Sequence, residues 1–178
     1  ESPSSTPQVK DGRVYLSPVG LFSVKNEKEV LALDLDTGKY ERHNTTQVVK
    51  LGLAVDNQYL YTSNKLNFDA KICKTDLQSG EVQSKSFGGE VTIGDLFLID
   101  GRLYAFVLKN NGQTKLQSLI YVLDPENLSV LQEIDVSSCG EAQSDLVKCN
   151  GKLYFNNPYT GEYNPDAQPC NRISALDL

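Results

Sequence analysis

The sequence has few of the residues on which metal and cofactor chemistry depends. Its 178 residues include no tryptophan, no methionine and a single histidine, His43. The four cysteines contain no CxxC pair, and one histidine does not complete a usual zinc site. No GxSxG motif accompanies His43, so no hydrolytic triad is predicted. We therefore expect no metal, no cofactor and no catalytic residue, and the sequence favours a non-enzymatic function.

Long apolar runs and basic clusters are absent too. No apolar run is long enough to span a bilayer, and no stretch keeps the apolar spacing of a helix over ten residues. The formal net charge is −6 and the isoelectric point is about 4.8. Nucleic acids and anionic membranes attract clustered Lys and Arg. These absences argue against nucleic acid as a partner and against membrane insertion.

The clearest structural signal is the stretch 118–136, SLIYVLDPENLSVLQEIDV. Its residues 119–123 are aliphatic or aromatic, which predicts a strand buried on both faces. Asp124 and Pro125 then favour a tight turn. Apolar and polar residues alternate over 129–136, as in a half-exposed strand. The stretch therefore predicts a hairpin that runs from a buried strand to an exposed one.

Weaker copies of this hairpin recur along the chain. Each copy has an aspartate after an apolar strand, and these are Asp34, Asp76, Asp124 and Asp177. Gly38 and Gly80 supply the positive φ that the first two turns need. The equivalent residue of the third copy is Leu128, which predicts a different turn there.

A second repeated unit precedes each hairpin. It holds a turn of the Asp-Gly or Asn-Gly kind, which marks tight hairpins, and then an apolar residue and a tyrosine. These repeat tyrosines are Tyr15, Tyr61, Tyr104 and Tyr154, which lie 46, 43 and 50 residues apart. A four-strand unit with this period is typical of propeller blades. The predicted fold class is all-β, a β-propeller of antiparallel strands.

We predict a flexible lead-in at residues 1–7 and a partial propeller domain over residues 8–178. It holds about four blades of four strands, the last one incomplete. The blades are expected at residues 8–43, 48–87, 91–136 and 144–178. The missing strand after Asp177 leaves a sheet edge of the kind that folded proteins normally cover. We expect a part of a six- to eight-bladed ring, or an edge that pairs with another copy.

Two segments resemble known propeller families. LALDLDTGKYER is similar to the quinoprotein blade pattern through Ala32, Asp34, Thr37 and Gly38, with Tyr40 where that family has tryptophan. LIYVLDPENLSVLQEIDV resembles a YVTN repeat. The resemblance implies the propeller fold and carries over no functional residue. A quinone site would need a stacking tryptophan and adjacent cysteines, and this sequence has neither.

The four cysteines are Cys73, Cys139, Cys149 and Cys170. Blade geometry places Cys139 and Cys170 in connections on the same face of the propeller, so these two are the predicted disulfide. Cys149 is expected at a turn on the opposite face and Cys73 within an inner strand, both reduced or one paired outside the chain. The alternative is four free thiols in a cytosolic protein.

Two N-glycosylation sequons begin at Asn44 and Asn127. About two such matches arise by chance in a sequence of this composition, so they do not establish modification. Both fall in predicted loops, where glycosylation is possible if the chain is secreted.

The segment 156–170, NNPYTGEYNPDAQPC, is the predicted binding loop. Exposed tyrosines with adaptable polar groups are typical of loops that bind partners. We predict Tyr159 and Tyr163 as anchors, with Asn157, Asn164 and Asp166 as polar contacts. The alternative is a disordered insertion between two strands.

The leading functional hypothesis is a secreted or extracellular propeller that presents loops to a protein or a glycan. A cytoplasmic location is the alternative. Two other functions stay open: a part of a propeller enzyme whose catalytic residues lie outside this chain, and an assembly subunit that docks through an open blade edge by strand addition. The expected partner is another polypeptide that completes or docks on the propeller.

Overall fold

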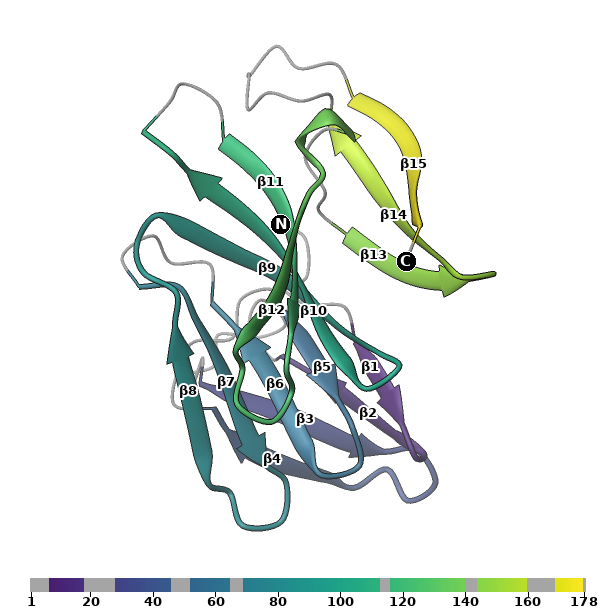
Figure 1. Ribbon diagram of the computed structural model, residues 1–178. Helices are drawn as coiled ribbons and strands as arrows, with labels where there is room; N and C mark the ends of the chain where they lie inside the picture. The colour runs from purple at the N-terminus through teal and green to yellow at the C-terminus, as the bar shows by residue number, and fades with distance from the viewer. Residues whose placement is uncertain are drawn as a thin grey trace. The chain divides into compact units, whose positions relative to one another are not determined.

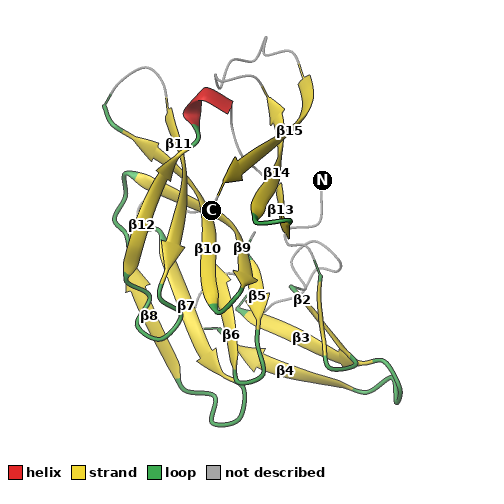
Figure 2. Ribbon diagram, turned by 45° about the vertical axis from the view of Figure 1, so that its right-hand side comes forward, coloured by secondary structure: helices red, strands yellow, loops and turns green. Residues whose placement is uncertain are grey.

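The computed structural model describes residues 7–17, 28–45, 52–64, 69–112, 116–139, 144–159 and 169–177. At residues 144, 157–159 and 169–172 only the backbone is described. Within these ranges the chain is β-strand, apart from turns and one 3₁₀ turn, η1 (Ser137–Cys139). Figure 2 shows η1 in red and the strands in yellow. No helix in these ranges has the length and apolar character needed to cross a membrane.

The strands form four antiparallel sheets, each a meander of neighbours in the chain (Figure 1). The strands of the first two sheets are β1 (Gln8–Lys10), β2 (Arg13–Leu16), β3 (Glu29–Asp34), β4 (Tyr40–Asn44), β5 (Leu53–Val55), β6 (Tyr59–Ser63), β7 (Lys71–Asp76) and β8 (Val82–Ser86). Those of the last two are β9 (Val91–Ile99), β10 (Arg102–Asn110), β11 (Leu116–Leu123), β12 (Val130–Asp135), β13 (Ser144–Cys149), β14 (Lys152–Tyr159) and β15 (Pro169–Asp177). The predicted all-β class is confirmed, and the fourth sheet has three strands, as expected.

The turn between the third and fourth strands is built around the repeated aspartate. Asp34 Oδ1 accepts hydrogen bonds from the backbone N–H groups of Asp36 and Thr37, at 3.1 and 2.8 Å. Asp76 Oδ1 accepts the equivalent bonds from Gln78 and Ser79, at 2.9 and 2.8 Å. A short acceptor side chain thus satisfies the donors that the turn leaves without a ladder partner.

The prediction of a different turn at Leu128 was wrong. The Leu128 N–H donates to the Asp124 carbonyl at 2.8 Å, just as Gly38 donates to Asp34 at 2.9 Å. Leu128 has a φ of 60°, close to the 68° of Gly38. A left-handed leucine costs about 1–2 kcal/mol. Its side chain is fully buried, and burying a leucine contributes about 1.5–3 kcal/mol, which offsets that cost.

Each sheet has two faces that follow the repeat. We call the face that carries the repeat tyrosine the forward face, and the face that carries the apolar residue before it the backward face. Opposite pairs such as Tyr15 with Ala32, and Val14 with Leu33, fix which residues share a face. Because side chains alternate along a strand, the two sets lie on opposite sides of the sheet.

The chain divides into two compact units, residues 1–89 and 90–178. In the first unit, Tyr15 and Val30 on the forward face of β1–β4 pack against Leu53 and Leu60 on the backward face of β5–β8. The second unit repeats this arrangement between β9–β12 and β13–β15. Its core residues are Tyr104, Phe106, Ile120, Val122, Val136, Leu146, Leu153 and Phe155. Each unit is therefore held by one forward face packed on one backward face.

We expect Ile120→Ala to destabilise the second unit by about 2–5 kcal/mol, because it leaves a cavity in this core. Ile120 is fully buried. Leu131→Ala on the exposed strand β12 is the matched control, since Leu131 is 49% exposed. Urea unfolding followed by circular dichroism measures both. Equal effects of the two substitutions would contradict the assigned core.

We expect Asp34→Ala to lower the melting temperature by a few degrees, and Asp36→Ala to leave it unchanged. Hydrogen bonds from Thr37 and Asp36 hold the pKa of Asp34 below its ordinary 3.8, and those from Ser79 and Gln58 lower the pKa of Asp76 in the same way. A lowered pKa contributes stability above the unfolded value, and that stability is lost as pH falls through the folded value. Thermal melts between neutral pH and pH 2 should show a smaller acid loss in Asp34→Ala than in the wild type.

Candidate functional site

The forward face of the β13–β15 sheet carries exposed apolar side chains. Val147, Tyr154 and Ala175 lie opposite one another across the three strands. Ile173 lies two residues before Ala175 on the same face. Val147 is 59% exposed and Ile173 is 78% exposed. Large aliphatic side chains at such positions of a sheet favour contact with another apolar surface.

A cavity of about 420 Å³ lies on this sheet, lined by Asp145, Val147, Tyr154, Phe155, Asn156 and Ile173. The ladder is irregular between Ser144 and Leu146, and Asp145 has a φ of 56° there. Such a bulge turns a side chain away from its regular direction. The cavity combines apolar walls with one carboxylate and one amide, a combination that suits the side chains of a protein partner.

The predicted binding loop begins beside this cavity. Asn156 lines the cavity, and the next residue, Asn157, pairs with Arg172 through the backbone. Tyr159 pairs with Pro169 in the same ladder. The side chains of Asn157 and Tyr159 are not described, and Tyr163, Asn164 and Asp166 lie outside the described residues. Their role in binding stays a prediction.

The backward face of β1–β4 forms a second exposed apolar surface. Four residues form a row across this sheet, each opposite the next: Val9, Val14, Leu33 and Tyr40. The row therefore crosses all four strands. Val9 is 69% exposed and Tyr40 is 60% exposed. The sequence prediction missed both exposed faces, because the apolar residues that form them look like ordinary core positions.

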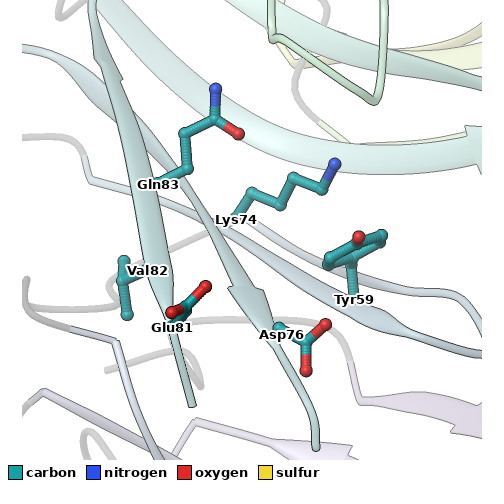
Figure 3. A pocket seen from close by; sticks show the side chains of 6 residues that line it. All are labelled: Tyr59, Lys74, Asp76, Glu81, Val82 and Gln83. Carbon is teal, nitrogen blue, oxygen red and sulfur yellow. The ribbon is translucent and has the colours of Figure 1, made fainter. Parts of the chain in front are cut away.

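A second cavity, of about 390 Å³, lies on the forward face of β5–β8. Its lining residues are Tyr59, Lys74, Asp76, Glu81, Val82 and Gln83. Figure 3 shows the Lys74 side chain reaching from β7 toward the ring of Tyr59. The Lys74 Nζ atom lies 3.8 Å from the centre of that ring. The sequence prediction missed this site, although a lysine at an otherwise apolar position of the repeat was a signal.

The cysteines differ in exposure. Cys149 is exposed, Cys139 is half-buried and Cys73 is buried in β7, and no disulfide joins these three cysteines. The described part of the chain gives no support to a Cys139–Cys170 bond, and the side chain of Cys170 is not described. That pairing stays a prediction.

Both sequon asparagines are exposed on the surface. Asn44 is the last residue of β4, so its predicted position in a loop was wrong. Asn127 lies in the turn after Asp124, as predicted, where its Oδ1 atom accepts a hydrogen bond of 2.8 Å from Ser129 N–H. Glycosylation of either residue stays a prediction.

The single histidine and the acidic residues provide no metal site in the described ranges. His43 lies on β4 with its ring 6.3 Å from that of Tyr15, and burial lowers its pKa below 6.5. No group of three or more His, Cys, Asp or Glu side chains in these ranges is arranged to hold a metal ion.

Comparisons with solved structures show the fold. The chain is similar to a europium-containing methanol dehydrogenase, with a TM-score of 0.61 and 14% identity over 98% of this chain and 40% of that one. A quinohemoprotein alcohol dehydrogenase from Pseudomonas putida HK5 gives 0.59 and 14% identity over 86% and 28%. An α-L-arabinofuranosidase from Clostridium thermocellum gives 0.54 and 16% identity over 97% and 67%.

The chain has a β-propeller fold that resembles quinoprotein propellers, as its repeats predicted. It spans less than half the length of the two dehydrogenases. No protein-family model matches the sequence, and a search of curated proteins finds no similar sequence. At these identities the likeness extends to the fold alone.

Thiol labelling tests the cysteine prediction. We expect Cys149 to react at once in the native chain and Cys73 to react only after unfolding, because reagent access follows exposure. Labelling in denaturant without a reductant should modify two thiols if Cys139 and Cys170 are bonded. Four modified thiols would rule the disulfide out, and mass spectrometry of the peptides identifies the residues.

Proposed function

We propose that this chain is an extracellular β-propeller binding module that docks on a protein partner through the forward face of β13–β15 and the adjoining loop at residues 156–170. The observation that carries the proposal is the exposure of Val147 and Ile173 on that face. Within each unit, the forward face of the first sheet is covered by the second sheet. Apolar exposure favours a protein over a glycan as the partner of this surface.

The internal interfaces indicate what the partner presents. In each unit a forward face with a repeat tyrosine, Tyr15 or Tyr104, packs on the backward face of the next sheet. Tyr154 holds the equivalent position on the forward face of β13–β15 and lines its cavity. The complementary surface is therefore a backward face with aliphatic residues across its strands.

This chain itself carries such a face on β1–β4, formed by Val9, Val14, Leu33 and Tyr40. We therefore commit to a second copy of the chain as the partner, docked head to tail. Such a contact joins two different surfaces, so each copy keeps one face for a further contact.

The expected affinity is low. Complete burial contributes about 1.5–3 kcal/mol for each aliphatic side chain, and only a few large side chains are exposed on each face. Association costs about 4–15 kcal/mol in lost freedom of motion. The net charge of −6 on each copy adds repulsion, which salt screens. We expect weak, reversible association that strengthens with ionic strength.

We predict that the wild-type chain self-associates as its concentration rises, and that Ile173→Asp and Val9→Asp each stop this. A carboxylate buried in an apolar contact is costly. Ile173→Asp keeps an intact backward face and Val9→Asp keeps an intact forward face. An equimolar mixture of the two should therefore form a heterodimer, although each alone is monomeric. Sedimentation velocity measures all three samples.

Leu131→Asp is the matched control, because Leu131 is a 49% exposed leucine on β12, outside both faces. It should associate like the wild type. A wild-type chain that stays monomeric at its highest soluble concentration contradicts the proposal. So does association that Leu131→Asp reduces as much as Ile173→Asp, or a mixture that fails to dimerise.

A further inference from the structure

The single histidine of the chain lies beside the core of the first unit. His43 is opposite Val30 in the β3–β4 ladder, and Val30 is fully buried in that core. The imidazole therefore belongs to the forward face of β1–β4, which β5–β8 covers. The centre of its ring is 6.3 Å from that of Tyr15, another residue of the same core. A charge on this ring is thus a charge beside the packing that holds the unit together.

His43 is also the main contact between β4 and that core. β4 is the outer strand of its sheet (Figure 1). Its other four residues are exposed, and the half-buried histidine is the exception. Outer strands with few buried side chains are the first parts of a fold to open. The packing of β4 against β5–β8 therefore depends on one side chain that can change its charge.

The second unit has an aliphatic residue at the equivalent position. Val30 and Ile120 correspond, because each lies two residues before the residue opposite a repeat tyrosine. The residue paired with Ile120 on the outer strand is Ile134, and Ile134 packs against the core of its unit. The fold therefore accepts an aliphatic side chain where the first unit has a histidine.

One of the two ring nitrogens of His43 is shielded from water. The Nε2 atom is buried and has no hydrogen-bond partner within the described residues. A neutral imidazole tolerates this, because it can keep its proton on Nδ1. The imidazolium ion has a proton on both nitrogens, so its Nε2–H group would be a buried donor without an acceptor. Burial accordingly lowers the pKa of His43 below 6.5.

The ionisable groups around the ring do not remove this cost. Besides burial, Glu41 raises the pKa of His43 and Arg13 lowers it. These two groups bond each other at 3.0 Å, so they act on the ring as one ion pair. On the backward face of β5–β8, which packs against this side, the ionisable residues of the strands are Lys71 and Cys73. Neither supplies a carboxylate to Nε2.

The part of β5–β8 that packs into this core is aliphatic, and it consists of Leu53, Val55, Leu60 and Leu77. Such side chains cannot solvate an imidazolium ion. The charged ring reaches water only if β4 moves away from β5–β8. We propose that His43 is an acid-sensitive contact, which holds β4 on β5–β8 while the ring is neutral and releases it when the ring is protonated. The device belongs to the first unit and does not depend on the docking of a second copy.

The direction of the pH effect follows from linkage. A histidine with a lowered pKa in the closed state contributes stability above its pKa in the open state, and this stability is lost as pH falls through the closed value. The carboxylates of Asp34 and Asp76 have pKa values below 3.8. Their loss therefore comes at lower pH, and the range from about pH 7.5 to about pH 5 reports on the histidine.

Hydrogen exchange of the whole chain, read by mass spectrometry and corrected for the intrinsic effect of pH, tests the proposal. We expect the protection of β3–β4 amides to fall about tenfold between about pH 7.5 and about pH 5, which corresponds to a pKa difference of one unit between the closed and open states. Peptides from β11 and β12 should keep their protection. His43→Ile, which installs the residue of the equivalent position in β12, should abolish the loss in β3–β4.

The wild-type chain provides a second measurement that needs no variant. Because the sequence has one histidine, its ring protons are assigned in an NMR titration without ambiguity. We expect a pKa below 6.5 in the native chain. Unchanged protection of β3–β4 at about pH 5, the same loss in His43→Ile, or a histidine that titrates at or above 6.5 overturns the proposal. His43→Ile should still self-associate at neutral pH, so this proposal and the docking proposal fail separately.

Discussion

Each sheet depends on a neighbouring sheet of the same unit to cover one of its faces. In a strand, successive side chains point to opposite sides, and the inner strands here carry apolar residues on both. β11, for example, is buried from Ser118 to Leu123. One sheet therefore cannot satisfy itself. In both units the solution is the same: the face with the repeat tyrosine packs on the face with the aliphatic residue before it.

The aspartate turn makes this stacking possible, because it fixes the register between the third and fourth strands. A shift of one residue would move every side chain to the opposite face. The carboxylates of Asp34 and Asp76 bind turn donors, and the same backbone bond recurs at Leu128. The turn geometry thus persists even without glycine, provided that the residue in the left-handed conformation gains enough from burial.

The fold could be predicted from the sequence to a large extent, because repetition multiplies weak signals. The tyrosines at a period of about one blade and the aspartates after each third strand are both visible in the sequence. The turn at Leu128 could not be predicted, because local chemistry disfavours it and only the surrounding core compensates. β15 begins at Pro169 rather than at residue 172, since pairing with β14 extends a strand beyond its own apolar pattern.

The candidate sites were harder to predict. A sequence pattern predicts an apolar residue to be buried whether or not another sheet covers it. Nothing in the sequence therefore distinguishes Ile173, which is 78% exposed, from Ile120, which is 0% exposed. The cavity at Lys74 was not predicted, because a single lysine in a strand gives no signal on its own. A comparison of the four blades at the position opposite each repeat tyrosine would have found it.

The position opposite the repeat tyrosine carries side chains of different chemistry in different sheets. An apolar residue opposite the repeat tyrosine keeps the forward face suitable for packing. Val122, for example, lies there in the core of the second unit. On β5–β8 the residue at that position is Lys74, which is buried and lines a cavity with polar walls. The register bonds of the strand are unchanged, because they depend only on the backbone. The side chain at this position can therefore differ from blade to blade while the strand pairing stays the same.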